Sequence, residues 1–456
     1  MGKEFDLTPR TVPLVTTKYR RVATQLPHPE SVATIERLQR FEPRSMSGQP
    51  PVVWHEAEDF VVRDRHGNQW LDWTSGVLVA NVGHSAPEVR DAIIEQARSG
   101  LLHHYCFAAE PRAELVERLA RLAPPGLDKV FLLTTGSEAV ECAIKLCRAR
   151  GREIGGPRKI GIIGFERGFH GRTLGSQQAG GIPGLKTWIG NLDPGFITVP
   201  FPDGYWQADT RFDTLTQAVA AAGLAPGEIA GVIMESYQGV GPDFAPPAYV
   251  TALVAWCREH QITLVFDEVQ AGFGRTGRMW AFEHYGVTPD LICCGKGITS
   301  SLPLSAVLGR AAIMDLFPPG SMTSTHTGNP LCCVAALACL EKLERSGLVA
   351  NAGRLGPVLE AGLQRLQAAH PEIVGRVSAR GLVGGVQMVK PGTKTPDHDH
   401  AHDIVLRCFQ KGLLIFSPVG AWGQTVKIAP PLTTPADALE EGLEVLAEAV
   451  RESVSA

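Results

Sequence analysis

The sequence predicts an α/β fold in which a mainly parallel sheet is covered by helices on both faces. From about residue 130 onward, short apolar runs alternate with longer helical patterns. The predicted strands are almost continuously apolar, which is typical of parallel strands buried on both sides. The chain has 456 residues, of which 44% are hydrophobic, and this length favours two or three domains.

The strands and helices of this central part can be assigned in order along the chain. The first strand is predicted at 129–135, "KVFLLTT", and the first helix at 137–150, "SEAVECAIKLCRAR". A helical pattern at 247–261, "PAYVTALVAWCREHQ", separates two later strands. The other predicted strands are 159–165, 231–236, 263–269 and 290–295. Strands that alternate with helices predict strand–helix–strand units and therefore a parallel sheet.

The two ends of the chain predict a second, smaller domain. Residues 60–73, "FVVRDRHGNQWLDW", contain an "HGN" that is typical of a hairpin turn. After "HTGNP" (326–330), a long helical pattern is followed by short strands between helices. We therefore expect residues 76–330 to form a large domain, and residues 1–75 and 331–456 to form together a smaller α+β domain.

Charge and apolar runs exclude several classes of protein. The 43 basic and 47 acidic residues give a formal charge of −4, so no electrostatic argument favours nucleic acid or an anionic membrane as a partner. No apolar run approaches the roughly 18 residues that span a bilayer. The N-terminus also lacks the apolar stretch of a signal peptide. We therefore expect a cytoplasmic protein with no nucleic-acid or membrane partner.

The cysteines and histidines predict no metal or disulfide framework. Ten cysteines in a chain of this length are too sparse for a disulfide scaffold and are expected to be reduced, packed thiols. The adjacent pairs at 293–294 and 332–333 lack the spacing of a zinc site. The tract "DHDHAHD" (397–403) fits a solvated loop that runs into a helix better than a metal-binding tract. No metal site is expected.

Gly136 and Ser137 form the first candidate for a phosphate-binding site. They lie in "LLTTGSEAVECAIKL", between a predicted strand and a predicted helix. The backbone N–H groups of a helix N-terminus, together with a serine hydroxyl, suit a phosphate. An ordinary helix cap made by Thr135 or Ser137 explains the same residues, so both interpretations stay open.

A second glycine motif, "GFGRTG" (272–277), favours a rival function. It matches the dinucleotide-binding fingerprint and follows a predicted strand, which makes a nucleotide-dependent oxidoreductase the alternative. Asp267 and Glu268 would, however, place carboxylates near the supposed pyrophosphate. The residues that follow, "RMWAFEHYG", also lack the small apolar start of a helix packed on a sheet.

Lys296 stands between two glycines in "LICCGKGITS", at the end of a predicted strand. A lysine that forms a Schiff base with pyridoxal phosphate requires a phosphate cradle, a carboxylate at the pyridine nitrogen and a flat group against the ring. Asp267 ends the strand before it, 29 positions earlier. Open α/β sheets bind ligands at the carboxyl ends of their strands. Gly136, Ser137, Asp267 and Lys296 therefore occur in the order that such a site needs, although each alone has an ordinary structural explanation.

This ordered set resembles the class-III, fold-type I pyridoxal-phosphate aminotransferases, which include 4-aminobutyrate, ornithine and ω-amino-acid aminotransferases. The resemblance covers about residues 50–445 and rests on the motifs "TTGSEAVECAIKLCR", "GFHGRTLGS", "FDEVQAGFGRTG", "PDLICCGKGI", "STHTGNP" and "IAPPLT". It implies pyridoxal 5'-phosphate as cofactor, transamination between an amine or amino acid and an oxo acid, and a homodimer or tetramer. It also implies that "GFGRTG" is a loop after the aspartate.

The resemblance implies a role for each residue that matches a cofactor motif. Lys296 would carry the cofactor and move the substrate proton. Asp267 would pair with the pyridine nitrogen, Val269 would pack under the ring, and Gln270 would contact the ring hydroxyl. Phe169, in "GFHGRT", would stack on the other face of the ring.

The phosphate would be shared between subunits. Gly136 and Ser137 would form the cradle, and Thr325, in "STHTGNP", would reach the phosphate of the neighbouring subunit. The site would thus be completed across a homodimer interface. His170 and His326 are expected to be structural, since the lysine already supplies the base.

The substrate residues are carried over from the 4-aminobutyrate members. Arg172 matches the arginine that holds the distal carboxylate, Val77 matches an apolar pocket residue, and Glu235 matches a glutamate near the pocket. Lys427 stands where those enzymes have the arginine that binds the α-carboxylate of glutamate or 2-oxoglutarate. Val240 stands where they have the glutamate that pairs with this arginine when the other substrate binds. An ammonium group does not reproduce the bidentate contact of a guanidinium.

The presence of Val240 and Lys427 at these two positions changes which substrates the resemblance implies. Together with Trp422, in "GAWGQ", Val240 would make the pocket more apolar, which favours an amine or ω-amino acid donor with pyruvate or a related oxo acid as acceptor. An amino-acid racemase or epimerase would use the same lysine but return the proton to the opposite face of Cα. A decarboxylating aminotransferase is less favoured. The sequence leaves these alternatives open.

Overall fold

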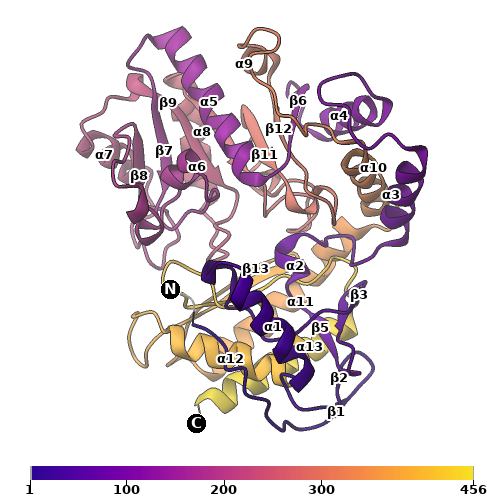
Figure 1. The fold of residues 1–456 in the computed structure, drawn as a ribbon. Coiled ribbons are helices and arrows are strands. Elements are labelled where there is room, and N and C mark those ends of the chain that lie inside the picture. The colour runs from indigo at the N-terminus through magenta and orange to yellow at the C-terminus, as the bar shows by residue number, and fades with distance from the viewer. Residues whose placement is uncertain (1–2, 455–456) are drawn as a thin grey trace. The chain divides into compact units, whose positions relative to one another are not determined.

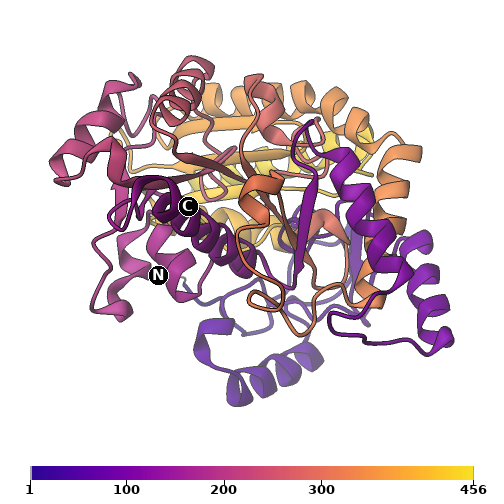
Figure 2. The same ribbon diagram turned by 90° about the horizontal axis from the view of Figure 1, so that it is seen from above.

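The computed structural model describes residues 3–454 and divides into two compact units. The small unit consists of the chain up to Ala86, the segment Val240–Pro242 and the chain from Ala350 onward; the large unit consists of Pro87–Gly239 and Asp243–Val349. We expected the domain boundaries after residues 75 and 330. The observed boundaries, after Ala86 and Val349, both lie later in the chain. The second limit lies later because helix α10 (Pro330–Arg345) packs on helices α3 and α4 of the large unit (Figures 1 and 2).

The large unit is built on a seven-stranded sheet with the strand order β6-β12-β11-β10-β9-β7-β8. Strand β12 is antiparallel to both of its neighbours, and the other pairs are parallel. The strands are β6 (Lys129–Leu133), β7 (Gly161–Phe165), β8 (Phe196–Val199), β9 (Ile229–Glu235), β10 (Thr263–Asp267), β11 (Leu291–Cys294) and β12 (Ser305–Gly309). Because the parallel strands point the same way, their carboxyl ends meet at one edge of the sheet.

Helices cover both faces of this sheet. Helix α5 (Gly136–Gly155) packs across β9, β11 and β12 (Figure 1). Its apolar side forms one core with residues such as Val265 and Cys293. Phe266 and Cys294, whose side chains alternate to the other face, are also buried. The other helices of the unit are α3 (Pro87–Ser99), α4 (Glu110–Leu122), α6 (Leu174–Ala179), α7 (Asp213–Ala221), α8 (Pro247–Glu259) and α9 (Ala311–Met314).

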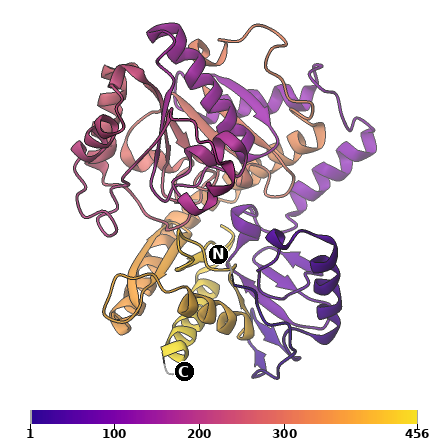
Figure 3. The ribbon, with the colours of Figure 1, turned by 60° about the vertical axis from the view of Figure 1, so that its left-hand side comes forward.

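The small unit joins the two ends of the chain. Strand β15 (Leu413–Leu414) pairs in parallel with β5 (Gln69–Asp72), so the C-terminal segment extends the N-terminal sheet (Figure 3). Trp70 and Phe409 stack in the core between them, with ring centroids 5.5 Å apart. The other strands of that sheet are β1 (Val15–Thr16), β2 (Arg21–Val22), β3 (Glu56–Glu58) and β4 (Val61–Arg63).

A three-stranded antiparallel sheet and four long helices complete the small unit. The sheet has the order β13 (Val374–Arg380), β14 (Val383–Met388), β16 (Thr425–Ile428). The helices are α1 (Pro29–Phe41), α11 (Leu348–Ala369), α12 (His398–Gln410) and α13 (Ala436–Val454). The tract at 397–403 forms the start of α12, where the Asp397 carboxylate accepts hydrogen bonds from the backbone N–H groups of Asp399 and His400.

A left-handed turn follows strand β5. Ser75, Gly76, Val77 and Leu78, assigned as α2, have φ angles of 48°, 57°, 67° and 62°. The conformation costs roughly 1–2 kcal/mol for each residue that has a Cβ. Hydrogen bonds hold the turn: Ser75 Oγ donates to the Ala429 carbonyl at 2.6 Å, and Thr74 Oγ1 accepts from the Gly76 N–H at 2.9 Å.

Two further observations concern the whole described chain. No helix within residues 3–454 has the length and apolar character needed to cross a membrane. All ten cysteines are free thiols. Cys293 and Cys294 are fully buried on opposite faces of β11, and burial raises the pKa of both thiols well above the ordinary range.

Candidate active site

A cavity of about 260 Å³ lies where the parallel strands of the large unit end. Asp267 and Glu235 are the last residues of β10 and β9, and Lys296 follows β11. The cavity is lined by Thr135, Gly136, Ser137, Phe169, His170, Gly171, Arg172, Glu235, Asp267, Val269, Gln270 and Lys296. Seven of the eight cofactor residues named from the sequence are therefore together in one cavity.

The first wall of the cavity is the N-terminus of helix α5. Thr135 caps this helix: its Oγ1 accepts from the Glu138 N–H at 3.2 Å, and the Glu138 carboxylate accepts from the Thr135 N–H at 2.8 Å. The cap predicted from sequence is thus made by Thr135. Gly136 and Ser137 begin the helix at the cavity, where first-turn N–H groups have no partner within the helix.

The loop after β7 forms the second wall. Gly171 has a φ of 130°, and a Cβ at this position would lie 2.3 Å from Ser137 Oγ. Only glycine therefore lets the loop approach helix α5, where Ser137 Oγ accepts from the Arg172 N–H at 3.2 Å. The guanidinium of Arg172 lies 5.6 Å from the centre of the Phe169 ring, so an aromatic face and a positive charge stand side by side.

Asp267 is held on both of its oxygens. Oδ1 accepts from the Val269 N–H at 3.0 Å, and Oδ2 lies 2.7 Å from His170 Nδ1. Burial by itself lowers the pKa of His170, but the hydrogen bond and charge of Asp267 and the charge of Glu235 outweigh it and raise the pKa. His170 therefore carries its proton toward Asp267 and keeps that carboxylate oriented, a positioning role that the sequence pattern did not reveal.

Lys296 is almost enclosed behind these residues. It begins a short 3₁₀ turn with a φ of 45°, a conformation that is uncommon outside glycine and is concentrated at functional sites. Burial lowers the pKa of Lys296, and the negative charges of Asp267 and Glu235 oppose this effect without cancelling it. A lysine whose pKa is lowered has a larger neutral fraction, and the neutral amine is the nucleophile and base.

Glu235 lies beneath the Phe169 loop. Its Oε2 accepts from the Phe169 N–H at 2.9 Å, and its Oε1 accepts from the Gly239 N–H at 2.8 Å. Burial raises the pKa of Glu235 to about 7, against the positive charge of His170. Glu235 therefore fixes the Phe169 loop to strand β9, and its carboxyl is only partly ionised near neutral pH.

Glu268 is buried, and the sequence named it only as an argument against a pyrophosphate site. Its oxygens accept from the backbone N–H groups of Ala281 and Phe282, both at 2.9 Å, and from the Ser236 hydroxyl. Burial raises the pKa of Glu268 to about 7. These hydrogen bonds connect the residues after the "GFGRTG" turn to the end of β10, at the edge of the sheet where the cavity lies.

Replacement of Glu268 by glutamine should flatten the decline of stability with pH. Between pH 4.5 and 7 the folded carboxyl keeps a proton that the unfolded chain has released, so the unfolding free energy falls as pH rises through this window. This change in the pKa of Glu268 corresponds to a loss on the order of 3 kcal/mol in the free energy of unfolding across the window. Thermal unfolding with saturating cofactor from pH 5 to 8 would show a smaller loss of Tm in Glu268→Gln, and parallel curves would contradict the assignment.

The "GFGRTG" motif does not open a helix. Residues after β10 continue as turns, and the next element is the five-residue 3₁₀ helix η5 (Ala281–Tyr285). A dinucleotide site needs a helix whose N-terminus follows the glycines directly. The oxidoreductase alternative is therefore wrong.

Five of the residues named for the cofactor or the substrate pocket do not line the cavity. Thr325 is exposed on the loop before α10. Val77, Val240, Trp422 and Lys427 belong to the small unit. Val77 is 48% exposed in the left-handed turn, and Lys427 is buried on β16.

The segment that carries Val240 packs on the sheet that carries Lys427. The segment Val240–Pro242 packs on β14, where Gln387 Nε2 donates to the Gly241 carbonyl at 3.1 Å. A Cβ on Gly385 would lie 2.6 Å from Pro242 Cδ, and Gly385 is the cross-strand partner of Lys427. Gly385 therefore contacts the Val240–Pro242 segment and pairs with Lys427 on the neighbouring strand.

Few cofactors require a lysine amine, a buried carboxylate and a helix N-terminus in one cavity, and pyridoxal phosphate requires all three. The capped helix end, the Asp267–His170 pair and the enclosed Lys296 fit this cofactor. The fold and the cavity therefore define the class of fold-type I pyridoxal-phosphate enzymes.

Comparison with known proteins identifies the family. Residues 44–450 match the family described as aminotransferase class-III, and the chain belongs to this pyridoxal-phosphate-dependent family. It is 34% identical to a 4-aminobutyrate aminotransferase of Mycobacterium leprae (94% of this chain, 97% of that protein). It is 34% identical to a 5-aminovalerate aminotransferase of Pseudomonas putida (90% of this chain, 96% of that protein).

A solved structure shows the same fold. The ornithine aminotransferase of Toxoplasma gondii superposes with a TM-score of 0.84 at 26% identity, over 94% of this chain and 97% of that one. The family, fold type and cofactor predicted from the sequence are confirmed. These relatives are aminotransferases, which favours transamination over the racemase alternative.

Proposed function

We propose that this protein transfers the amino group of an ω-amino acid, such as 4-aminobutyrate, to an oxo acid. The observation that carries the proposal is the enclosed Lys296 with its lowered pKa, in one cavity with Asp267 and the Phe169–Arg172 loop. The 4-aminobutyrate and 5-aminovalerate aminotransferases among its relatives support this class of donor.

Different residues of the cavity would bind different parts of the cofactor. Gly136 and Ser137 would bind its phosphate through N–H groups and a hydroxyl. Asp267, oriented by His170, would keep the pyridine nitrogen protonated, and Gln270 would bind the ring hydroxyl. Phe169 and Val269 would pack against the two faces of the ring. Bound pyridoxal phosphate supplies an electron sink that stabilises negative charge on the substrate carbon next to the amine.

Lys296 performs the proton transfers. Its neutral Nζ would remove the proton from the substrate carbon and hold it as the ammonium form until it is delivered. The nearby carboxylates of Asp267 and Glu235 favour that ammonium form, while burial favours the neutral amine. The net effect is a lowered pKa, which enlarges the fraction of neutral amine that can accept the proton from the substrate.

Arg172 and its neighbours would select the donor. The exposed guanidinium of Arg172 would hold the distal carboxylate of an ω-amino acid, and Glu235 would fix the loop that carries it. Val77 would contact the methylene chain of the donor through its exposed side chain.

The function is tested with the purified, cofactor-loaded protein. Incubation with 4-aminobutyrate or 5-aminovalerate plus pyruvate or 2-oxoglutarate should yield alanine or glutamate, measured by chromatography. A protein that does not take up pyridoxal phosphate, or that forms no amino acid from any donor and acceptor, would contradict the proposal. If a single enantiomer of an amino acid loses its optical activity without an oxo acid, the racemase alternative holds instead.

The identity of the acceptor is tested by introducing the arginine that binds the α-carboxylate together with the glutamate that pairs with it. The double variant Lys427→Arg with Val240→Glu should improve kcat/KM for 2-oxoglutarate by about 10- to 100-fold, because each charge-assisted hydrogen bond contributes about 1.5–3 kcal/mol. The packing of the Val240 segment beside the Lys427 strand supports this coupling. Val240→Glu alone is the control and should not improve it, since the new carboxylate lacks its arginine. No gain in the double variant would mean that these residues do not face the acceptor.

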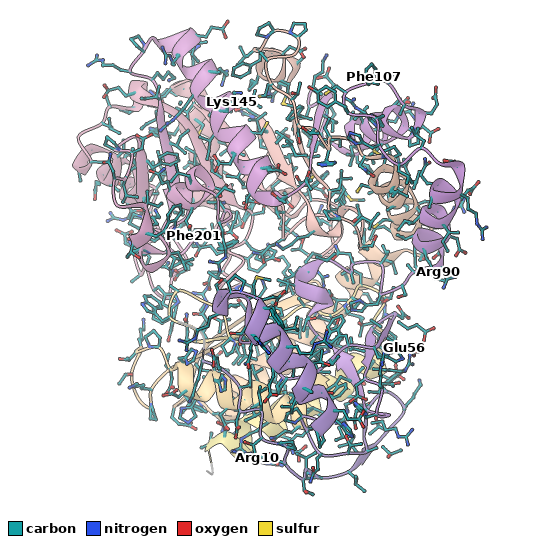
Figure 4. All side chains as sticks on the ribbon, in the orientation of Figure 1. Arg10, Glu56, Arg90, Phe107, Lys145 and Phe201 are labelled. Carbon is teal, nitrogen blue, oxygen red and sulfur yellow. The ribbon has the colours of Figure 1, made fainter. Side chains whose placement is uncertain are left out.

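We also propose a homodimer in which Thr325 binds the phosphate of the neighbouring subunit. An exposed apolar segment supports it: Leu101, Leu102, Tyr105 and Phe107 are 42%, 50%, 41% and 76% exposed, and Phe107 projects outward near α4 (Figure 4). This segment is tied to the Thr325 loop, since His104 Nε2 lies 2.7 Å from the Gly328 carbonyl oxygen. A monomer in sedimentation at micromolar concentration would contradict the dimer.

A cytoplasmic location is part of the same proposal. It is supported by ten unpaired cysteines, most of them buried, because disulfides form in oxidising compartments and reduced thiols persist in the cytoplasm. Cell fractionation with immunodetection tests it, and recovery of the protein outside the cytoplasmic fraction would contradict it.

A further inference from the structure

Three metal-ligating side chains converge in the small unit, apart from the catalytic residues. His28 and Glu30 stand at the start of helix α1, and His66 stands in the turn between β4 and β5. Each offers one ligand atom, and the three atoms lie within 4.8 Å of one another. Within residues 3–454, no other group of three or more His, Cys, Asp or Glu residues meets this condition.

The turn that carries His66 is held in place by the segment that leads to His28. Asp64 Oδ1 accepts from the N–H groups of His66 and Asn68, at 2.8 and 2.9 Å. The Asn68 side chain donates to Thr24 Oγ1 at 2.8 Å and accepts from the Ala23 N–H at 2.8 Å. The two histidines are thus brought together by hydrogen bonds of their neighbours, before any ligand binds.

The two imidazoles lie against each other. Their ring centroids are 3.4 Å apart and their planes differ by 10°. Because an imidazole binds a metal in its own plane, one ring has to turn out of this stack before both can bind the same ion. Both histidines are half-buried, whereas Glu30 is exposed and its carboxylate can rotate toward them. A helix-cap hydrogen bond would compete with a metal for one imidazole nitrogen: His28 Nδ1 accepts from the Glu30 N–H at 3.2 Å.

We propose that His28, Glu30 and His66 bind a divalent transition-metal ion, with zinc as the best chemical match and water in the remaining position. Imidazole nitrogen and carboxylate oxygen are zinc ligands, at about 2.0–2.2 Å from the ion. Tetrahedral ligands at this distance are roughly 3.3 Å apart, so the group has to close by about 1–1.5 Å. Rotation of the exposed Glu30 side chain and of one imidazole about its side-chain bonds would supply this movement.

The bound ion would act as a structural link. It would join the first turn of α1 to the β4–β5 hairpin, two parts of the chain whose ligands are 36 to 38 positions apart in sequence. Such an ion stabilises the folded protein because it binds the assembled ligands and not the unfolded chain. It lies outside the catalytic residues, so this inference does not depend on the proposed transamination.

Isothermal titration of the untagged, cofactor-loaded protein with zinc chloride tests the site. We expect one equivalent of zinc to bind and to raise Tm. His66→Ala should weaken this binding at least about tenfold, because even the loss of an outer partner of a metal ligand costs about 10- to 100-fold. His28→Asn removes the imidazole but keeps a side-chain oxygen that can cap α1, and it should weaken binding to a similar extent.

His55→Ala is the matched control. His55 precedes the same hairpin and accepts from Arg65 Nε at 3.3 Å, but it does not belong to the group. Its replacement should leave zinc binding unchanged. Equal affinity in His66→Ala and the unmodified protein, no binding up to millimolar zinc, or loss of binding in Cys106→Ser, which removes an exposed thiol, would each overturn the proposal.

Discussion

Lys296→Ala is expected to lower the rate of transamination by about 10²- to 10⁴-fold or more, the range that a positioned proton-transfer group contributes. The variant loses both the amine that attaches the cofactor and the base that moves the substrate proton. The remaining walls of the cavity, including the α5 N-terminus and the Asp267–His170 pair, are unchanged. Cofactor should therefore still bind to Lys296→Ala, but reversibly.

The measurement combines steady-state rates with borohydride reduction. Reduction should fix the cofactor covalently on the unmodified chain and leave it removable by dialysis from Lys296→Ala. Lys145→Ala is the control, since Lys145 is an exposed lysine of α5 whose Nζ lies 4.7 Å from the centre of the Phe317 ring (Figure 4). A Lys296→Ala variant that retains the normal rate would exclude Lys296 as the reacting group.

Asp267→Asn is expected to lower kcat by about 10²- to 10³-fold, the usual effect of removing one preorganised electrostatic contact from a reacting centre. Asparagine has the shape of aspartate and can still accept from the Val269 N–H. It cannot supply the negative charge that keeps the pyridine nitrogen protonated, and it removes the charge that holds the proton on His170.

A companion variant separates the charge of Asp267 from its orientation. His170→Gln keeps a donor for the Asp267 carboxylate but removes the positive charge, and it should cost less than Asp267→Asn. It should also change the pH profile of kcat, because the histidine with the raised pKa is gone. Equal losses in both variants, with the same pH profile, would show that His170 acts only through packing.

Most of the large unit was predictable because its strands are apolar on both faces. The five predicted strands correspond to β6, β7, β9, β10 and β11. Strands β8 and β12 were missed, since "FITV" is short and "SAVLG" is made largely of small residues. The antiparallel pairing of β12 depends on contacts with distant strands, which no local pattern encodes.

The meeting of the candidate site residues in one cavity was predictable for a different reason. Parallel strands bring their carboxyl ends to one edge, so the order Gly136, Asp267, Lys296 along the chain already implies proximity. The hydrogen bond between His170 and Asp267 was not predictable, because it depends on the path of the loop after β7, which no local pattern encodes. The packing of Val240–Pro242 on β14 and the meeting of His28 with His66 are also long-range contacts.

The left-handed turn at Ser75–Leu78 bears on how this protein could be stabilised. A glycine at position 77 would adopt a φ of 67° without steric strain, so a search for thermal stability alone would replace the valine. This chain nevertheless keeps a β-branched residue there, about half exposed, in the conformation that suits it least. The strain therefore agrees with the proposed contact between Val77 and the donor, which glycine could not make. A Val77→Gly variant chosen for stability alone would relieve the backbone strain and remove the side chain proposed for that contact.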